Sequence, residues 1–312
     1  MKAVLREVAR RLAGAIGVLL GAATLAFLVL HLIPGDPVTV LLGPNTSVTP
    51  QVRLQIAEQY GFDRPVIEQY LTYLGHLVRG DLGESYQLQR PVAALIGAQL
   101  APTAALALAA LVLAVVLALL SALATAGRRP AWRGLAILYE LVAASTPSYW
   151  VGVVLLTFLS FRFRLFPVAG GQDLRSLVLP AVTLALPVAG VLAQVLRESL
   201  ENALEQPFVV TARARGLSET ATRTRHALAH AAVPTLTLTG WITGTLLGGA
   251  VLVEAVFGRP GLGSLTLSAV DSKDMPVVIG VVLLSAAVFV ALANLVDILS
   301  AAIDPRLRSG AR

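Results

Sequence analysis

Six uncharged stretches, each 19 residues or longer, constrain the fold of this chain more than any other feature. A helix that crosses a hydrocarbon layer roughly 30 Å thick needs about 20 apolar residues. Because lipid offers the backbone no hydrogen-bond partner, helices must carry these stretches. The sequence therefore predicts an all-α polytopic membrane protein with six transmembrane helices, at residues 12–30, 101–127, 141–161, 176–196, 231–253 and 275–296.

The composition excludes several other classes of protein. Hydrophobic residues make up 56% of the chain and charged residues only 13%, with a mean hydropathy of +0.77. These values are far from those of a soluble globular protein. The absence of cysteine excludes disulfides, thiolate metal sites and thiol nucleophiles. The pI of about 10.2 is interpreted as a topology signal, and no nucleic-acid partner is predicted.

The arginines predict the orientation in the membrane. Most of the 24 Lys and Arg residues lie at the two termini and in the loops that follow the second and fourth apolar stretches. Positive charge is enriched on the cytoplasmic side of membrane proteins. Both termini are therefore predicted to be cytoplasmic.

A long outer region follows the first apolar stretch. Two prolines and a glycine at residues 33–37 stop the first helix. Thr49 is placed to cap a short helix that ends at Gly61, and a second helix is predicted from Pro65 to Gly80. The second helix should pack on the membrane region or lie in its interface, because its apolar residues recur at helical spacing: Ile67, Tyr70, Leu71, Leu74 and Val78.

Glycine and proline also mark the later segments. Residues 258–263 contain three glycines and a proline, which favour a tight re-entrant turn over a regular helix. Pro147 in the third apolar stretch, and Pro180 and Pro187 in the fourth, are placed to kink their helices, either as hinges or as static packing features.

The side chains carry little chemistry of their own. The chain has no Gly-Lys pair and hence no phosphate-binding P-loop. The acidic residues nearest the apolar stretches, Glu140, Glu254 and Asp297, are expected at helix ends, and the absence of midplane charge argues against an ion-coupled carrier. His226 and His230 have a metal-binding spacing, but an ordinary interfacial helix is favoured and no metal site is predicted. No catalytic residue is predicted either.

Residues 211–218 read TARARGLS, followed by RHAL at 225–228 and a proline at 234. This pattern resembles the cytoplasmic signature of membrane subunits of ATP-binding-cassette (ABC) importers. More narrowly, the chain is similar to the B-type permease of dipeptide and oligopeptide transporters, a family that also includes nickel importers. Further stretches resemble that family, at residues 33–37, 80–86, 147–150, 253–257, 260–263 and 304–306.

The resemblance implies a type I importer permease fold with a helical extracytoplasmic insertion after the first span. It also implies a coupling helix that seats in a groove of the ATPase subunit. In that helix, Ala212 and Ala214 are small enough for close approach, Gly216 is expected to end the helix and turn the chain, and Arg213 and Arg215 offer donors to an acidic rim. The residues it assigns to ATPase coupling are Phe208, Thr211, Ala212, Arg213, Ala214, Arg215, Gly216, Leu217 and Ser218. Its gate or structural signature candidates are Glu254, Pro260, Gly261 and Gly263. The sequence departs from the wider importer signature at 210–212, where Val-Thr-Ala replaces acid-Ala-Ala.

The implied function is that of a membrane subunit of an ATP-driven importer of di- or oligopeptides, a multi-pass protein of the bacterial cytoplasmic membrane. The implied partners are a second, C-type permease, two ATPase subunits or one fused ATPase chain, an extracytoplasmic peptide-binding protein, and membrane lipid. ATP and Mg²⁺ would be bound by the ATPase subunits and no cofactor by this chain. Nickel, glutathione or another small solute is the alternative cargo. An autonomous secondary carrier and an intramembrane enzyme are the rivals from other classes.

These expectations divide the chain into four segments. Residues 1–33 form a cytoplasmic leader and the first helix, and residues 34–98 form the extracytoplasmic helical region. Residues 99–304 form the permease core, which includes the cytoplasmic coupling loop 198–234. Residues 305–312 form a cytoplasmic tail.

Overall fold

A computed structural model of the chain describes residues 2–32, 38, 49–61, 63–128, 130–169 and 173–303. The family-like stretches at 33–37 and 304–306, and the tail 305–312, lie outside these residues. The described chain is helical, and its one β-type feature is an isolated bridge between Glu84 and Pro91. The predicted segment boundaries at 33, 98 and 304 stay predictions.

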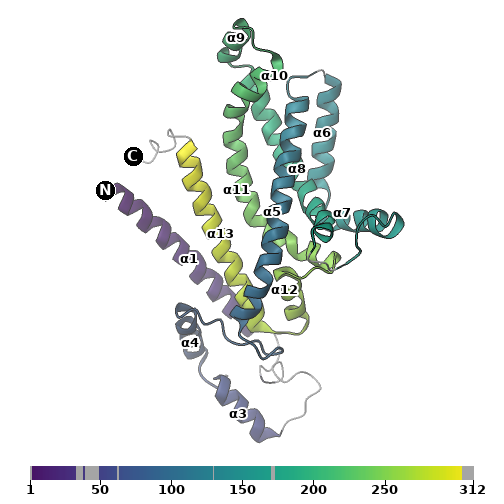
Figure 1. Cartoon of the computed structure of the whole chain (residues 1–312). Coiled ribbons are helices and arrows are strands. Elements are labelled where there is room, and N and C mark those ends of the chain that lie inside the picture. Colours follow the sequence, from purple (N-terminus) through teal and green to yellow (C-terminus); the bar gives the residue numbers. More distant parts are fainter. Residues whose placement is uncertain are drawn as a thin grey trace. The chain divides into compact units, whose positions relative to one another are not determined.

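The chain forms two compact units, which are described separately (Figure 1). The first unit comprises Met1–Ala101 and Ser264–Val290, and the second comprises Pro102–Gly263 and Ala291–Arg312. The elements in chain order are α1 (Lys2–Leu32), α3 (Pro50–Tyr60), α4 (Val66–Val78), α5 (Val92–Thr125), α6 (Pro130–Ser145), α7 (Ser148–Leu155), η1 (Leu156–Arg162), α8 (Leu174–Leu204), α9 (Pro207–Ala214), α10 (Glu219–Thr222), η2 (Arg223–Ala227), α11 (Leu228–Val256), α12 (Leu262–Asp271) and α13 (Met275–Ile303).

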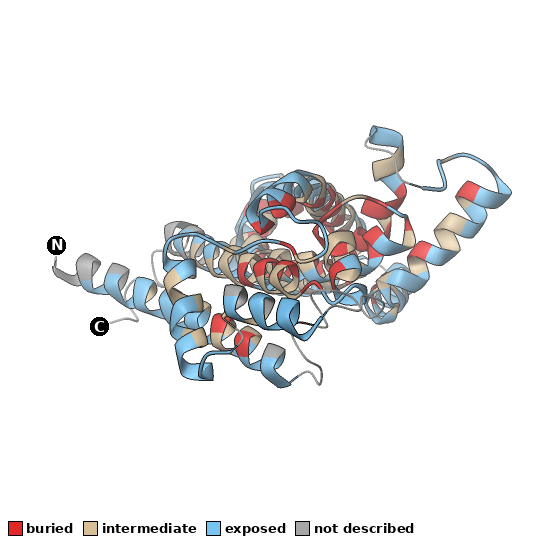
Figure 2. Ribbon diagram, turned by 90° about the horizontal axis from the view of Figure 1, so that it is seen from below, coloured by how far each residue is buried: buried red, intermediate tan, exposed pale blue. Residues whose placement is uncertain are grey.

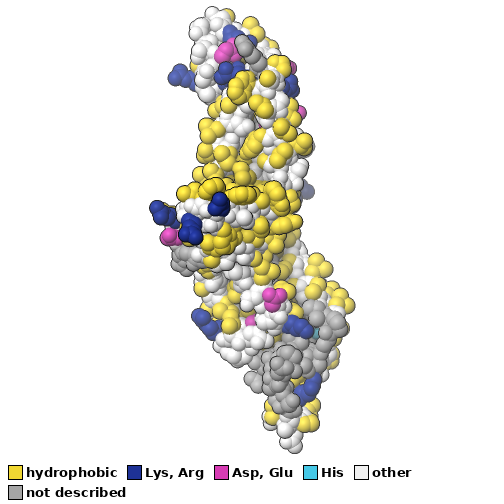
Figure 3. Space-filling model, turned by 90° about the vertical axis from the view of Figure 1, so that its right-hand side faces the viewer, with side chains coloured by type: hydrophobic (Ala, Val, Ile, Leu, Met, Phe, Trp, Pro, Cys, Tyr) yellow, Lys and Arg dark blue, Asp and Glu magenta, His cyan; other side chains and the backbone are white. Residues whose placement is uncertain are grey.

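Five helical spans in the described part of the chain are long and apolar enough to cross a membrane, and a bent pair can supply a sixth. The five spans are Ala9–Val29, Val92–Thr125, Leu174–Leu204, Glu219–Val256 and Met275–Val296. They confirm five of the predicted spans. In Figure 3, hydrophobic side chains are densest in the middle of the visible face, and a group of charged side chains lies at the top, where Figure 1 places α9 and α10.

The third predicted span is not one straight helix. The chain bends by 99° between α6 and the segment formed by α7 and η1. Pro147 stands at the break as the N-cap of α7. Proline has no backbone N–H, and it disfavours the helical conformation in the residue before it, which is Thr146. The predicted kink at Pro147 is therefore present as a sharp bend, and the predicted span at 141–161 is a sixth span only if α6 and the α7–η1 segment count as one bent span. By contrast, Pro180 and Pro187 both lie inside the single helix α8.

The second unit is built around α8. This helix packs against α6, α7 and α11, and Figure 1 shows α5, α6, α8 and α11 running side by side. In α8, 56% of the most apolar 18-residue window is buried, compared with 11% in α1. Other helices of the same chain therefore cover much of α8. Figure 2 shows buried residues gathered where the packed helices face one another, and exposed residues along most of α1.

A row of small residues allows α5 to join this core. Ala110, Ala114, Ala118 and Ala122 recur every four residues, and all four have no exposed surface. Residues four apart lie on one face of a helix. Small side chains on that face let helix backbones approach closely, which is the usual way in which helices pack in a membrane.

The helices of the outer region begin and end where the sequence predicts. Thr49 caps α3, with its hydroxyl accepting from the Val52 N–H, and Gly61 ends the helix in a left-handed conformation at φ 69°. α4 ends at Val78, and Gly80 follows at φ 78°. α4 contacts α1 within the first unit, through a 2.7 Å hydrogen bond between Tyr70 Oη and Thr24 Oγ1.

The stretch at 80–86 is held by a buried carboxylate within the same unit. Asp274, which is 2% exposed, accepts hydrogen bonds from the Ser85 hydroxyl and from the Tyr86 N–H at 3.0 Å. The Ser85 hydroxyl oxygen in turn accepts from the Leu88 N–H. These contacts give a structural reason for the polar residues of this stretch.

Candidate coupling segment and gate turn

The coupling segment, defined as residues 207–218, is a short helix followed by a tight turn. Pro207 is the first residue of α9, where its missing N–H costs no helical hydrogen bond. Gly216 stands at φ 82°, and its N–H donates to the Arg213 carbonyl at 2.9 Å. Ser218 then caps α10 by accepting from the Ala221 N–H. The prediction that Gly216 ends the helix and turns the chain is confirmed.

The members of this segment differ in exposure. Ala212 is buried within the chain, whereas Ala214 is exposed, so of these two small residues only Ala214 is available to a partner. Phe208 is half-buried, and its ring centroid lies 4.7 Å from that of His230, which joins α9 to the start of α11. Leu217 is also half-buried. The exposed members are Thr211, Arg213, Ala214, Arg215, Gly216 and Ser218.

The arginines of this segment also have different environments. Arg213 forms an ion pair with Glu219, with Nε 2.9 Å from Oε1 and a second hydrogen bond of 3.1 Å. Arg215 is exposed and is the better placed of the two to meet an acidic partner. Arg223, which the sequence reasoning did not assign, is 5% exposed and donates to the Gly127 carbonyl at 3.3 Å. Arg223 follows the coupling segment as the first residue of η2, and it ties η2 to the turn after α5.

The gate turn, defined as residues 254–263, encloses a buried carboxylate. Glu254 has no exposed surface, and its two oxygens accept hydrogen bonds from Thr103 Oγ1 at 2.6 Å and from the Gly263 N–H at 2.8 Å. The Leu262 N–H donates to Thr103 Oγ1 at 2.8 Å. Leu262 and Gly263 are the first residues of α12, so the negative charge lies where the helix dipole favours it.

Glycine is required at two positions of the gate turn. A Cβ on Gly261 would overlap the carboxylate of Glu254, and a Cβ on Gly263 would overlap the Cα of Val251. Pro260 is half-buried beside them. The predicted turn is confirmed for residues 258–261, but the helix α12 begins at Leu262, inside the stretch from which a regular helix was excluded. Its first N–H groups are satisfied by Thr103 and Glu254, and the sequence alone does not reveal this capping.

Two family models together match most of the chain. Residues 114–309 match the family described as "Binding-protein-dependent transport system inner membrane component", and residues 4–107 match the N-terminal family of the same transport systems. The chain belongs to this family. It is thus a permease subunit of an ABC importer and a multi-pass protein of the bacterial inner membrane, as the sequence predicts.

Individual relatives of the permease cover it almost completely. A glutathione transport system permease protein from Salmonella paratyphi A is 36% identical over 98% of this chain and 99% of that protein. A protein of Brucella abortus, provisionally named a peptide transport system permease protein, is 36% identical over 96% of this chain and 98% of its own length.

Two solved structures share the fold of the permease. An amino acid ABC transporter crystallised with histidines gives a TM-score of 0.53 at 17% identity, covering 67% of this chain and 94% of that one. The MetNI methionine ABC transporter gives 0.53 at 19% identity, covering 67% of this chain and 96% of that one. At these identities the likeness concerns the fold alone.

The permease also has a buried ion pair that the sequence reasoning missed. Glu140 was expected at a helix end, but it lies inside α6, because that helix begins at Pro130, well before the uncharged stretch. Its carboxylate accepts from Arg197 of α8, with Nη2 to Oε2 at 2.8 Å and Nε to Oε1 at 2.9 Å. Glu140 is 2% and Arg197 7% exposed. Glu201 extends the cluster, with Arg197 Nη1 at 3.4 Å and Arg133 Nη2 at 3.1 Å from its Oε2.

Replacing Arg197 with methionine is expected to lower the free energy of unfolding by about 3 kcal/mol, because it leaves the Glu140 carboxylate buried without its partner. The double variant Arg197→Met with Glu140→Gln should recover most of that loss. Thermal unfolding in detergent, followed by tryptophan fluorescence, measures both. If the single variant were as stable as the parent, the pair would have no structural role.

Proposed function

We propose that this permease is one of two membrane subunits of an ATP-driven importer that moves di- or oligopeptides by alternating access. The observation that carries the proposal is the exposed turn at Gly216, held between α9 and α10 at one end of a bundle of apolar helices. Such a turn offers a soluble partner a rigid contact that is continuous with the membrane helices. Closure of the partner would then move α8 and α11 together.

The proposed complex contains further subunits. These are a second, C-type permease, two ATPase subunits or one fused ATPase chain, and an extracytoplasmic peptide-binding protein. ATP and Mg²⁺ would bind to the ATPase subunits, since the sequence of this chain has no P-loop. Of the coupling residues 208 and 211–218, the exposed members 211, 213–216 and 218 would face the ATPase, and the buried Ala212 would support them from within the chain. The gate turn would hold α11 and the start of α12 at a fixed angle during the cycle.

The proposed topology places both termini and the coupling segment in the cytoplasm, and α3 and α4 outside. The distribution of arginine supports this orientation. In this arrangement the buried Glu140–Arg197 pair stays within the helix bundle as a structural link, which agrees with a transporter whose energy comes from partner subunits.

Two cargo classes have support from named relatives. The Brucella protein is named for peptides and the Salmonella protein for glutathione, which is itself a tripeptide. A short peptide with free termini is a class of cargo that includes both. Nickel or another small solute remains the alternative cargo, and an autonomous secondary carrier the alternative mechanism.

The test is an ATPase assay on the chain alone and on the complex with its candidate permease, ATPase and binding-protein partners, with peptides added. We expect hydrolysis only in the assembled complex, with stimulation by the loaded binding protein. ATP hydrolysis or ion-driven flux by this chain alone would overturn the proposal and favour the secondary carrier.

A further inference from the structure

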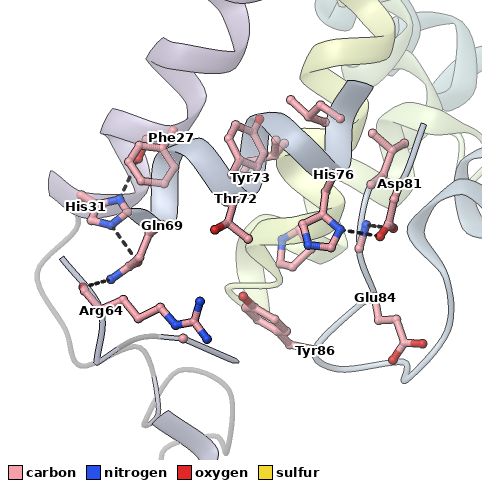
Figure 4. A pocket seen from close by; sticks show the side chains of 16 residues that line it. Phe27, His31, Arg64, Gln69, Thr72, Tyr73, His76, Asp81, Glu84 and Tyr86 are labelled. Atoms are coloured by element: carbon pink, nitrogen blue, oxygen red, sulfur yellow. Dashed lines mark hydrogen bonds and ion pairs between the residues drawn. The ribbon is translucent and has the colours of Figure 1, made fainter. Parts of the chain in front are cut away.

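A pocket of about 470 Å³ opens within the first unit, among α1, α4, residues 81–86 and the start of α13 (Figure 4). Its volume lies within the range of roughly 300–1,000 Å³ that is usual for small-molecule sites. Every residue that lines it belongs to this unit. In the proposed topology, the pocket lies on the extracytoplasmic side.

Opposite charges face the pocket from different sides. Figure 4 shows the Arg64 side chain extending toward the Tyr86 ring from one side and the Glu84 side chain on the other side of that ring, and both residues line the pocket. Both side chains are exposed, and hence accessible to a ligand. A ligand that satisfied both would need a negative group at one end and a positive group at the other.

The second carboxylate of the pocket already has partners. Asp81 Oδ2 lies 2.8 Å from His76 Nδ1, and its Oδ1 accepts from the Gly83 N–H at 2.9 Å. The Gly83 hydrogen bond and then His76 lower the pKa of Asp81, so that it stays ionised at neutral pH. Asp81 therefore shapes the turn that carries Glu84, and Glu84 is the better candidate to meet a cation.

Three aromatic residues, Phe27, Tyr73 and Tyr86, form part of the pocket wall. Phe27 and Tyr73 stack at 5.7 Å between ring centroids, and Tyr86 stands across from them in Figure 4. Burial, and then the neighbouring Tyr70, raise the pKa of Tyr73 to about 12. This phenol therefore stays uncharged. Such rings offer apolar contact to the side chains of a ligand without adding charge.

We infer that this pocket binds a short peptide by its two charged ends, with the carboxylate on Arg64, the ammonium group on Glu84 and the side chains against the aromatic wall. The inference rests on the proposed function, because it makes the pocket a transient binding site for the cargo on the extracytoplasmic side of the membrane. A bare metal ion fits less well, since the described residues contain no group of three His, Asp or Glu side chains able to hold one.

The experiment measures peptide binding to the assembled transporter without its binding protein, by isothermal titration in nanodiscs. The probes are trialanine, its C-terminal amide, its N-acetyl form, and glutathione. The variants are Arg64→Gln and Glu84→Gln. Arg79→Gln and Glu68→Gln are matched controls, because both residues are exposed on or beside α4 and neither lines the pocket.

We expect Arg64→Gln to weaken trialanine binding by about two- to fivefold, the scale of one ion pair at an exposed site. The same substitution should leave binding of the C-terminal amide unchanged, because that probe has no carboxylate to lose. Glu84→Gln should show the reciprocal pattern, weakening trialanine but not its N-acetyl form. Neither control variant should change the binding of any probe.

Equal binding of trialanine by Arg64→Gln and Arg79→Gln, or equal binding of trialanine and its amide by the parent, would overturn the inference. So would a loss of stimulation by the binding protein in Arg64→Gln with trialanine binding intact, since that result would make the pocket a protein-docking site. Uptake into proteoliposomes separates the two proposals. If peptide is taken up but does not bind in the pocket, only the proposed peptide site is rejected. If peptide binds in the pocket but is not taken up when ATP is supplied, the proposed function in peptide import is rejected.

Discussion

Replacing Gly216 with tryptophan is expected to abolish peptide uptake while leaving the complex assembled. Gly216 has φ 82°, a conformation that costs other residues about 1–2 kcal/mol, and a Cβ there would meet no atom of this chain within 4 Å. The substitution should therefore change the shape and bulk of the coupling segment with little effect on the core. ATPase activity and uptake of the purified complex are the measurements, with subunit stoichiometry as the check on assembly.

Three companion variants make this result specific to the coupling turn. Gly216→Asn should retain uptake, because asparagine tolerates the left-handed conformation and is small. Gly216→Val should lose it, because a β-branched residue does not. Gly80→Trp is the matched control, since Gly80 has φ 78° and an equally open surrounding but lies outside the coupling segment. A Gly216→Trp complex that still couples hydrolysis to uptake would refute the coupling role.

The second large effect is expected at the gate turn, where Gly261→Ala should destabilise the chain by about 3 kcal/mol. The new Cβ would overlap the Glu254 carboxylate, which has no exposed surface to move into. Relief requires the carboxylate to leave Thr103 Oγ1 or the Gly263 N–H, so overpacking and a lost hydrogen bond add together. Thermal unfolding in detergent and the yield of folded protein measure the loss.

The control is Gly248→Ala, on the helix α11 that also carries Glu254. A Cβ on Gly248 meets nothing within 4 Å, so this variant should be neutral or slightly stabilising. Glu254→Gln should cost less than Gly261→Ala, about 1–3 kcal/mol, because the amide keeps the shape and one acceptor. If Gly261→Ala were as stable as Gly248→Ala, the packing of the gate turn would not be as described.

The helix ends show what local sequence can predict. Thr49, Gly61, Gly80 and Gly216 stand at the helix ends expected of them, because caps and left-handed turns depend on residues within one turn of the chain. The break at Pro147 also has a local cause, but its size does not. A slight kink and a 99° bend can arise at the same proline, and the packing of α7 against α8 selects between them.

The side-chain contacts were the least predictable part. Ala212 and Ala214 look alike in sequence, yet only Ala214 is exposed. Glu140 seemed to lie at a helix end because a hydropathy window stops at a charge, whereas the helix continues through it and the charge is neutralised by Arg197. Neither result follows from spacing, since each depends on what a distant segment brings to the same place.

By itself, the sequence determined the class of protein, five of the apolar spans, the ends of the outer helices and the turn at Gly216, because hydropathy and backbone preferences act over a few neighbouring residues. Only the tertiary structure decided three features. These are the Glu140–Arg197 ion pair, the hydrogen bonds from Thr103 and Gly263 to the Glu254 carboxylate, and the pocket that Arg64 and Glu84 line. The physical reason is that buried polar groups must find partners, and those partners are 57 residues away for Glu140 and 151 residues away for Glu254.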